Sequence, residues 1–252
     1  MQMSHPSYIT FRVFDNIDKL RCGFSTRHGG VSAGSFSSLN LGNFLNDDPQ
    51  NIKTNRKRLY EQIGVREAQM ALPDQVHSAR VVLTDSSGVF PETDGLITHK
   101  NGLFLGVQTA DCFPVFFAVP KHKTVALIHA GWRGVVGGIL EKTLSCLTGD
   151  LSVATTDIYC AIGPGLQKEC FEVHADVFEK FEKKYHLTHP DKAKRFVDVS
   201  TYIFDQLLAA GIPEVQIERN TDCTHCMNNH YFSYRRDGIK SGRMMGLIGF
   251  DI

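Results

Sequence analysis

Three short segments contain side chains of the types that bind metal ions and that a hydrophobic core does not need. They are Asp74-Gln75-Val76-His77, Thr109-Ala110-Asp111-Cys112 and His129-Ala130-Gly131-Trp132-Arg133-Gly134, each at the end of an apolar stretch or within one. Imidazole and thiolate are ligands that suit zinc. His77, Cys112 and His129 would supply three ligands and leave a fourth position for water or substrate, as catalytic zinc sites do.

The spacing of these three residues is by itself a weak signal. His77 and Cys112 are 35 residues apart and Cys112 and His129 are 17 apart, unlike the ligands of a compact zinc ribbon. Each also has an ordinary structural interpretation: a hydrogen-bonded strand histidine, a small buried hydrophobe and a satisfied core histidine, respectively. The residue types alone leave both interpretations open.

The elements that must position these residues are mainly strands. Apolar and β-branched runs predict strands over Tyr8–Phe14, Val76–Thr84, Leu103–Val107, Val115–Val119, Val125–His129 and Val215–Glu218. In the tail we expect a hairpin, in which Tyr231–Arg235 turns at Arg236-Asp237-Gly238 and returns through Met244–Phe250.

Four helices are expected beside these strands. The first begins after Asp48, with Pro49 in its first position, and ends at Gly64. The others are expected after Gly134, over about Asp176–Tyr185 and over about Asp198–Ala210. Strands and helices do not strictly alternate, and no glycine-rich nucleotide motif is present. We therefore expect an α+β fold with a mixed or antiparallel sheet.

Composition limits the class of protein. The 252 residues contain no linker-like tract, so we expect a single domain over residues 1–252. Lys plus Arg and Asp plus Glu each total 27, and this zero net charge gives no indication of a nucleic acid or an anionic membrane as partner. The longest apolar stretch, Cys112–Pro120, has nine residues, against the roughly 20 that a membrane span needs.

The cysteines point to a reducing compartment. Seven of them, an odd number, occur in a chain long enough to fold without disulfides. Met1–Phe14 has neither a signal-peptide nor a transit-peptide pattern, so we expect a cytoplasmic protein. Cys223 and Cys226 form a Cys-x-x-Cys pair, but His225 lies between them and no second pair exists. We therefore expect no second structural metal.

Further motifs extend the pattern of the first three segments: Phe24–Ser32, Ser38–Asn43, Gly163-Pro164, Cys170–Val173, Cys223–Cys226 and Phe232–Arg236. All of these motifs together, in this order and over nearly the whole length, closely resemble those of the multicopper-polyphenol-oxidase-like, or laccase-domain, family. Members of this family are now regarded as purine nucleoside phosphorylases. The resemblance implies a layered α/β/β/α sandwich of mixed sheets, similar to that of a class of cysteine hydrolases.

The resemblance also implies a ligand set. The family binds zinc through the His of Gln-Val-His, the Cys of Thr-Ala-Asp-Cys and the His of His-Ala-Gly-Trp-Arg-Gly, which map onto His77, Cys112 and His129. We therefore expect one zinc ion per chain, with copper possible in some relatives. Ser78 and His174 stand where glycine is common in the family, which affects loop detail rather than the ligands.

The activity implied by the resemblance is phosphorolysis of adenosine, inosine and methylthioadenosine, with deamination of adenosine as a second activity. The partners are then a small-molecule nucleoside and phosphate. Phosphorolysis needs a site that holds an anion. Arg27, beside a pair of glycines, and Arg133 are the candidates, with surface salt bridges as the alternative. Asp111 is a candidate general acid/base or orienting group, or only a turn cap.

Other functions stay open at this stage. Cys112 could be the nucleophile of a hydrolase acting on peptidoglycan precursors, as the name "peptidoglycan editing factor" of some relatives suggests, and activity would then survive metal removal. Copper-dependent phenol oxidation needs more clustered histidines than the 11 scattered ones present. A zinc-stabilised binding module is the non-enzymatic alternative. The sequence does not specify the oligomeric state.

Overall fold

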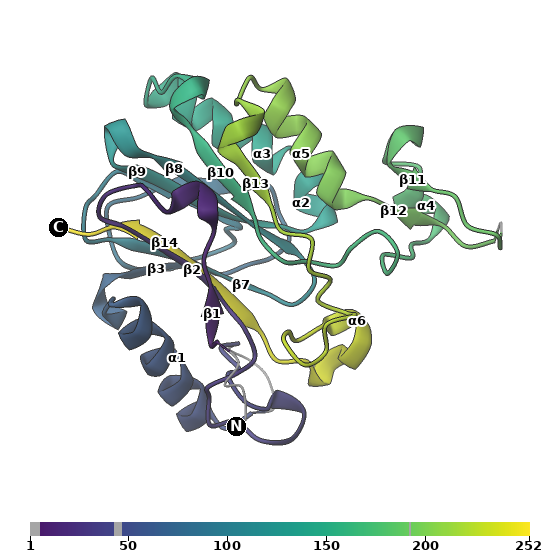
Figure 1. Cartoon of the computed structure of the whole chain (residues 1–252), viewed down its shortest axis with the longest axis horizontal. Coiled ribbons are helices and arrows are strands. Elements are labelled where there is room, and N and C mark those ends of the chain that lie inside the picture. Colours follow the sequence, from purple (N-terminus) through teal and green to yellow (C-terminus); the bar gives the residue numbers. More distant parts are fainter. Residues whose placement is uncertain (1–5, 43–46, 192) are drawn as a thin grey trace.

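Two mixed β-sheets lie face to face between layers of helices in the computed structural model of the chain (Figure 1). Residues 6–42, 47–191 and 193–252 are described. The first five residues of the Met1–Phe14 segment, and Asn43 of the Ser38–Asn43 motif, lie outside the described residues.

The first sheet has the strand order β1-β2-β14-β7-β3-β5. Its strands are Tyr8–Ile9 (β1), Leu20–Ser25 (β2), Met244–Phe250 (β14), Phe104–Thr109 (β7), Met70–Pro73 (β3) and Gly88–Phe90 (β5). β3 runs parallel to β5 and to β7, whereas β14 is antiparallel to both of its neighbours. The sheet is therefore mixed.

The second sheet has the order β13-β10-β8-β9-β6-β4. Its strands are Ile217–Arg219 (β13), Tyr159–Ile162 (β10), Phe113–Val119 (β8), Thr124–Ala130 (β9), Gly95–Thr98 (β6) and Val81–Leu83 (β4). The β10–β13 and β4–β6 pairs are parallel and the pairs between them are antiparallel. This sheet is also mixed.

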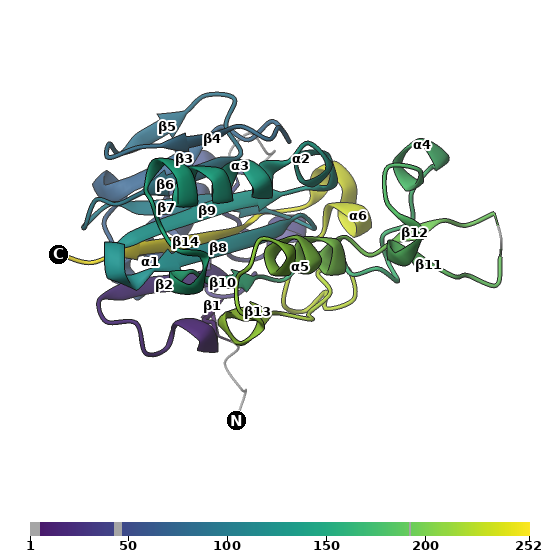
Figure 2. The ribbon, with the colours of Figure 1, turned by 90° about the horizontal axis from the view of Figure 1, so that it is seen from above.

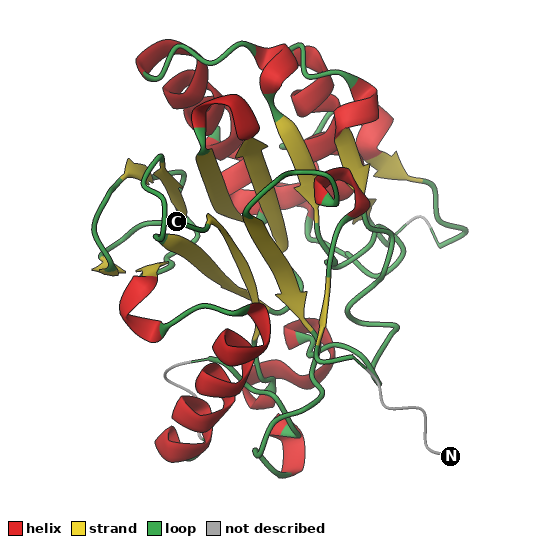
Figure 3. Ribbon diagram, turned by 60° about the vertical axis from the view of Figure 1, so that its left-hand side comes forward, coloured by secondary structure: helices red, strands yellow, loops and turns green. Residues whose placement is uncertain are grey.

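Helices cover the outer face of each sheet (Figures 1 and 2). α1 (Pro49–Ile63) packs on the first sheet, and α2 (Trp132–Val136), α3 (Ile139–Ser145) and α5 (Val199–Ala209) pack on the second. An arm formed by α4 (Ala175–Phe178), β11 (His186–Leu187) and β12 (Phe196–Val197) projects to one side, and α6 (Tyr234–Asp237) lies near its base. The expected α/β/β/α sandwich is confirmed, and Figure 3 shows the helices outside the strands.

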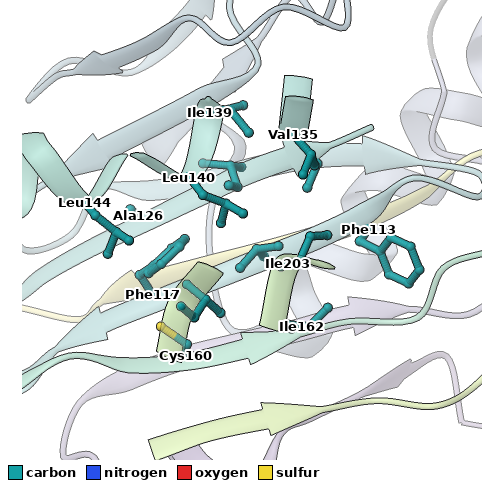
Figure 4. Packing of buried hydrophobic residues seen from close by; sticks show 14 of the residues in the cluster. Phe113, Phe117, Ala126, Val135, Ile139, Leu140, Leu144, Cys160, Ile162 and Ile203 are labelled. Carbon is teal, nitrogen blue, oxygen red and sulfur yellow. The ribbon is translucent and has the colours of Figure 1, made fainter. Parts of the chain in front are cut away.

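The middle strands are apolar along their whole length because both of their faces are covered. All seven residues of β8 are buried. Val115 and Phe117 pack under the helices, whereas Phe116 and Ala118 belong to the core between the sheets. Figure 4 shows Phe117 in the layer that the helices cover, near Leu140. A strand buried on both faces loses the alternation of a half-exposed one.

Two of the four predicted helices are confirmed with their caps. The Asp48 side chain accepts from the Gln50 backbone N–H, and Gly64 closes α1 in the left-handed conformation. Asp198 caps α5 through the Thr201 N–H. The other two are shorter than expected. The helix after Gly134 is broken at Gly137-Gly138 into α2 and α3, and the third is reduced to α4 and a separate 3-10 helix at Lys183–Tyr185.

The expected tail hairpin is wrong. Ser233 accepts from the Arg236 N–H and caps the short helix α6 where the first hairpin strand was expected. β14 pairs instead with β2 and β7, because it fills the middle of the first sheet. The predicted strands over Tyr8–Phe14 and Val76–Thr84 also shrink, to β1 and β4, and the residues before β4 form a loop that contains His77.

Three connections cross from the first sheet to the second at one end of the sandwich. β5, β3 and β7 are parallel neighbours, so their carboxyl ends reach the same edge. The chain leaves β3 for β4, β5 for β6 and β7 for β8. β9, which is antiparallel to β6 and β8, ends at the same edge. Residues in these connections therefore meet the last residues of β9.

Candidate metal centre

The three sheet-to-sheet connections and the end of β9 bring the predicted ligands together. His77 lies between β3 and β4, Cys112 lies immediately before β8, and His129 is the penultimate residue of β9. Their ligand atoms all lie within 4.8 Å of one another. The two imidazole rings meet edge to face, with centroids 4.8 Å apart. The cluster is thus a group that can hold a metal ion.

Asp94, in the connection between β5 and β6, organises two of the ligands. Its carboxylate accepts from the backbone N–H groups of Val76, His77 and Ser78, at 3.2, 3.0 and 2.6 Å. His77 has a φ of 60°, a strained conformation for a residue with a side chain. Three N–H groups converging on one buried carboxylate stabilise that turn.

The same carboxylate orients His129. Its Oδ1 lies 2.8 Å from Nδ1 of His129, and both side chains are buried. This contact occupies Nδ1 and leaves Nε2 as the ligand nitrogen, the arrangement that carboxylates commonly give to metal-binding histidines. Burial by itself raises the pKa of Asp94, but hydrogen bonds and charge from His129 and Ser78 outweigh it and keep the pKa below its usual value.

Cys112 and His129 each stabilise the charged form of the other. Burial by itself raises the pKa of the Cys112 thiol, but the charge of His129 and hydrogen bonds with His129 and His77 bring it down to about 6. Burial likewise lowers the pKa of His129, whereas Cys112 and Asp94 raise it to about 9. The thiolate form that metals bind therefore prevails at neutral pH.

Two glycines allow the chain to pass close to the cluster. A Cβ atom on Gly131 would lie 3.0 Å from the sulfur of Cys112 and 3.2 Å from Cδ2 of His77. A Cβ on Gly134 would lie 2.7 Å from the carbonyl oxygen of Ser78. Since α2 begins at Trp132, directly after Gly131, a larger residue at that position would press on two of the three ligands.

The cluster lies in a cavity of about 780 Å³, within the range of small-molecule sites. Its wall contains three arginines, Arg133, Arg235 and Arg243. The Arg133 guanidinium stacks on the ring of Trp132 and donates no hydrogen bond to another described residue. Arg235 donates to the carbonyls of Cys170 and Glu172. The pocket is therefore suited to an anionic ligand.

Asp111 also lines the cavity, next to Cys112, with a φ of 96°. Its two carboxylate oxygens accept from the Thr224 hydroxyl at 2.7 Å and from the Arg235 backbone N–H at 2.6 Å. These contacts connect the Cys112 loop to the start of α6. The geometry therefore favours the orienting role of Asp111 over transfer of a proton.

Arg27 does not line this cavity. Its side chain donates to the carbonyls of Ser37 and Asn228, at 2.9 and 2.7 Å, and its guanidinium lies over the ring of Phe232. Burial, and then the charge of Arg236, lower the pKa of Arg27. The structure thus gives Arg27 a role in holding loops together, away from the candidate metal centre.

Sequence reasoning missed Asp94, Arg235 and Arg243. Thr93-Asp94-Gly95 has the composition of an ordinary turn, and only the parallel β5–β3 pairing brings it to His77. Arg243 precedes β14, which was assigned to a hairpin. Arg235 was seen as part of a motif, but α6 had not been predicted. No local pattern distinguishes these residues.

Comparison with known proteins identifies the family. The sequence model described as multi-copper polyphenol oxidoreductase laccase matches residues 21–251. The chain belongs to this family. Similar proteins include "Purine nucleoside phosphorylase YlmD" of Geobacillus stearothermophilus, which is 34% identical over 90% of this chain and 89% of the relative. "Adenosine deaminase RL5" of an unknown prokaryotic organism is 34% identical, covering 87% of this chain and 90% of the relative.

Solved structures of laccase-family proteins share the fold. The crystal structure of YlmD from Geobacillus stearothermophilus superposes with a TM-score of 0.91 at 30% identity, covering 100% of this chain and 98% of that one. The Bacillus licheniformis protein YfiH also superposes with a TM-score of 0.91, at 31% identity over 98% of this chain and 97% of that one.

Among the described residues, no helix is both long and apolar enough to cross a membrane.

Proposed function

We propose that this chain is a zinc-dependent purine nucleoside phosphorylase that also deaminates adenosine. The observation that carries the proposal is the His77, Cys112 and His129 cluster in a cavity whose wall also contains three arginines. Relatives over nearly the whole chain bear the names of a purine nucleoside phosphorylase and an adenosine deaminase, which supports an enzyme. Adenosine, inosine and methylthioadenosine are the proposed substrates.

The donor set fits zinc. Two imidazoles and one thiolate are borderline ligands that zinc accepts, and three protein ligands leave one position open. Gly131 keeps the space beside Cys112 and His77 free of a side chain, which supports a ligand cluster rather than a packed core. When bound, zinc supplies a positive charge and Lewis acidity at this point of the cavity. Copper oxidation chemistry is disfavoured because, among the residues that the structure describes, only two histidines gather here.

The chain's own residues would perform the remaining tasks. Phosphorolysis places phosphate against the ribose and builds negative charge on the departing purine. Arg133 has a guanidinium available for phosphate, and Arg243 lies nearby in the same wall. Burial lowers the pKa of Arg243, while Asp111 and Cys112 act against that shift. Asp111 would position Cys112 and α6 around the bound nucleoside.

A phosphate titration tests the proposal. With adenosine or inosine and zinc-loaded protein, release of the free base should require phosphate. The Arg133→Ala change should lower phosphate-dependent turnover roughly ten- to hundredfold, since a charge-assisted contact is worth about 1.5 to 3 kcal/mol. Arg12→Ala, at an exposed arginine away from the pocket, is the matched control and should not change it. Base release that ignores phosphate would contradict phosphorolysis.

A cysteine hydrolase is the second candidate, and one observation favours it. Cys112 is hydrogen-bonded to His129, and His129 is hydrogen-bonded to Asp94. This is the order of a nucleophile, a base and an orienting carboxylate. Such an enzyme, acting for example on peptidoglycan precursors, would stay active without metal. Chelated, metal-free protein that retains full activity would favour this candidate, whereas activity restored by zinc alone supports the phosphorylase.

We also propose a reducing compartment, such as the cytoplasm, as the location of the protein. Cys112 of the candidate metal centre needs a free thiol in order to bind a metal ion. The proposed partners are small molecules, nucleoside and phosphate. A neutral net charge gives no support for nucleic acid or membrane as partner.

A further inference from the structure

A second cluster of thiols lies outside the candidate metal centre. The sulfur atoms of Cys170, Cys223 and Cys226 all lie within 4.8 Å of one another, and those of Cys170 and Cys226 are 3.3 Å apart. From the lack of a second Cys-x-x-Cys pair, and from His225 between Cys223 and Cys226, the sequence predicted no second structural metal. The structure supplies a third thiol from a single cysteine 56 residues before Cys226.

The sheet explains why these cysteines meet. β10 and β13 are parallel neighbours, so the loops that follow them leave the same edge. Cys170 is in the loop after β10, and the Cys-x-x-Cys pair is in the loop after β13. Gly165 and Cys223 form a parallel bridge, and the Thr224 N–H donates to the Gly165 carbonyl at 3.1 Å. The two loops are thus held in register independently of the thiols.

Each loop also has a turn that presents its sulfur atoms. The Cys170 N–H donates to the Gln167 carbonyl, and the Met227 N–H donates to the Cys223 carbonyl, both at 2.9 Å. One guanidinium nitrogen of Arg236 donates to the Thr224 and His225 carbonyls at 3.0 Å. None of these hydrogen bonds involves a sulfur atom, so the loops are held in shape without using the thiols.

We propose that Cys170, Cys223 and Cys226 bind a second zinc ion, which has a structural role. Tetrahedral thiolates about 2.3 Å from zinc lie about 3.8 Å from one another, a separation that the cluster already approaches. Three thiolates are a donor set that selects zinc or another thiophilic ion. Cys226 is exposed, so an ion can reach the cluster from solvent.

The second ion would hold one wall of the substrate cavity. Phe171, next to Cys170, lines that cavity, and so does Arg235, which donates to the Cys170 carbonyl. Thr224, next to Cys223, donates to Asp111. Zinc at the three thiols would therefore fix the loops that position Asp111 and Arg235. This inference does not depend on which reaction the enzyme performs.

Zinc stoichiometry tests the proposal. Full-length protein purified under reducing conditions should contain two zinc ions per chain, and Cys112→Ser and Cys223→Ser should each contain one. The double variant should contain none. Cys146→Ser, at a half-buried cysteine in neither cluster, is the matched control and should keep two. One zinc in the wild type that Cys112→Ser abolishes and Cys223→Ser retains would overturn the proposal.

Two further measurements keep the proposal testable if a cysteine variant folds poorly, and they distinguish a metal site from a disulfide. Cobalt bound to the Cys112→Ser protein, which keeps all three thiols of the second cluster, should show sulfur-to-cobalt charge-transfer absorption. Absence of that absorption would overturn the site. Thiol titration of the denatured wild type before reduction should detect all seven cysteines. Two thiols fewer, with Cys170 joined to Cys226, would show a redox pair in place of the metal.

Discussion

At the scale of single residues, Asp94 positions two ligands of the candidate metal centre. Its carboxylate accepts from three backbone N–H groups, from the Ser78 hydroxyl and from His129. An amide in its place would turn its own NH2 group toward one of these N–H donors. It would also lack the negative charge that orients His129. Asp94→Asn should therefore lower zinc affinity about 10- to 100-fold.

A competition titration with a zinc chelator measures this change. Asp85→Asn, at an exposed carboxylate beyond the His77 loop, is the matched control and should leave affinity unchanged. Circular dichroism shows whether the variant keeps its fold. A folded Asp94→Asn protein with wild-type zinc affinity would contradict the role given to this carboxylate.

The charge state of Cys112 leads to a prediction about pH. Its pKa of about 6 means that the thiolate prevails above that pH and is lost by protonation below it. In chelated protein the rate of Cys112 alkylation should therefore reach half of its maximum near pH 6, against about 8.5 for an ordinary thiol.

Peptide mass spectrometry after iodoacetamide treatment at a series of pH values follows the reaction at Cys112. Cys160 is the internal control, because burial raises its pKa and closes it to the reagent. Zinc should protect Cys112 at every pH above 6, since metal and alkylating agent compete for the same sulfur. A half-maximal rate near pH 8.5 would refute the ion pair with His129.

The individual residues show how far sequence reasoning reaches. Cys112 and the two histidines were found from segments that resemble those of a family, and the structure brings them together. Arg27 seemed equally suitable for an anion, but loop carbonyls occupy its side chain. Whether an arginine faces a ligand depends on contacts with distant residues, here Asn228, which the local sequence does not reveal.

Among the elements, the junction of β9 and α2 constrains the centre most closely. Gly131 has an ordinary φ of −74°, so alanine fits its backbone. The added Cβ would nevertheless lie 3.0 Å from the Cys112 sulfur. Gly131→Ala should displace this ligand and weaken zinc binding by about tenfold or more, or at least about 1.4 kcal/mol.

Gly149→Ala provides the control for this substitution, because a Cβ there meets no atom within 4 Å. Zinc affinity and thermal stability of both variants are compared with the wild type. Gly131→Ala should lose affinity while melting as a folded protein, and Gly149→Ala should change neither quantity by much. Unchanged zinc binding in Gly131→Ala would mean that the ligands have room to move.

Local capping signals predicted elements better than pairing signals did. Asp48, Pro49 and Gly64 define α1 within a few residues, and each acts on its own helix. The Asp237-Gly238 turn suggested a hairpin, but strand partners are chosen by the whole sheet, and β14 pairs with β2 and β7. Gly137-Gly138 ended a helix that the apolar spacing alone would have continued.

In the whole molecule, both metal-binding clusters follow from parallel strand pairs. Parallel neighbours send their carboxyl ends to one edge, so loops far apart in the sequence meet there. The β5–β3–β7 set gathers Asp94, His77 and Cys112, and the β10–β13 pair gathers the three thiols. The sheet order that creates both clusters cannot be deduced from spacing.

Because the first cluster joins the two sheets, metal removal should weaken the whole sandwich. A ligand that binds only the folded state, present at 100 times its Kd, adds about 2.7 kcal/mol. For a chain of this size that corresponds to a fall in Tm of about 5 to 11 °C when the ion of the first cluster is removed. The protein should still unfold in one transition, as expected for a single domain with continuous cores.

Calorimetry of zinc-loaded and chelated protein measures the Tm and the number of unfolding transitions. The Cys112→Ser variant separates the contributions of the two clusters. In that variant the dependence of Tm on zinc should shrink to the part due to Cys170, Cys223 and Cys226. The buried cores should keep the chelated protein folded, since they do not include the ligands. Two separate transitions would divide the chain into domains, and a Tm independent of zinc would show that the ion does not join the sheets.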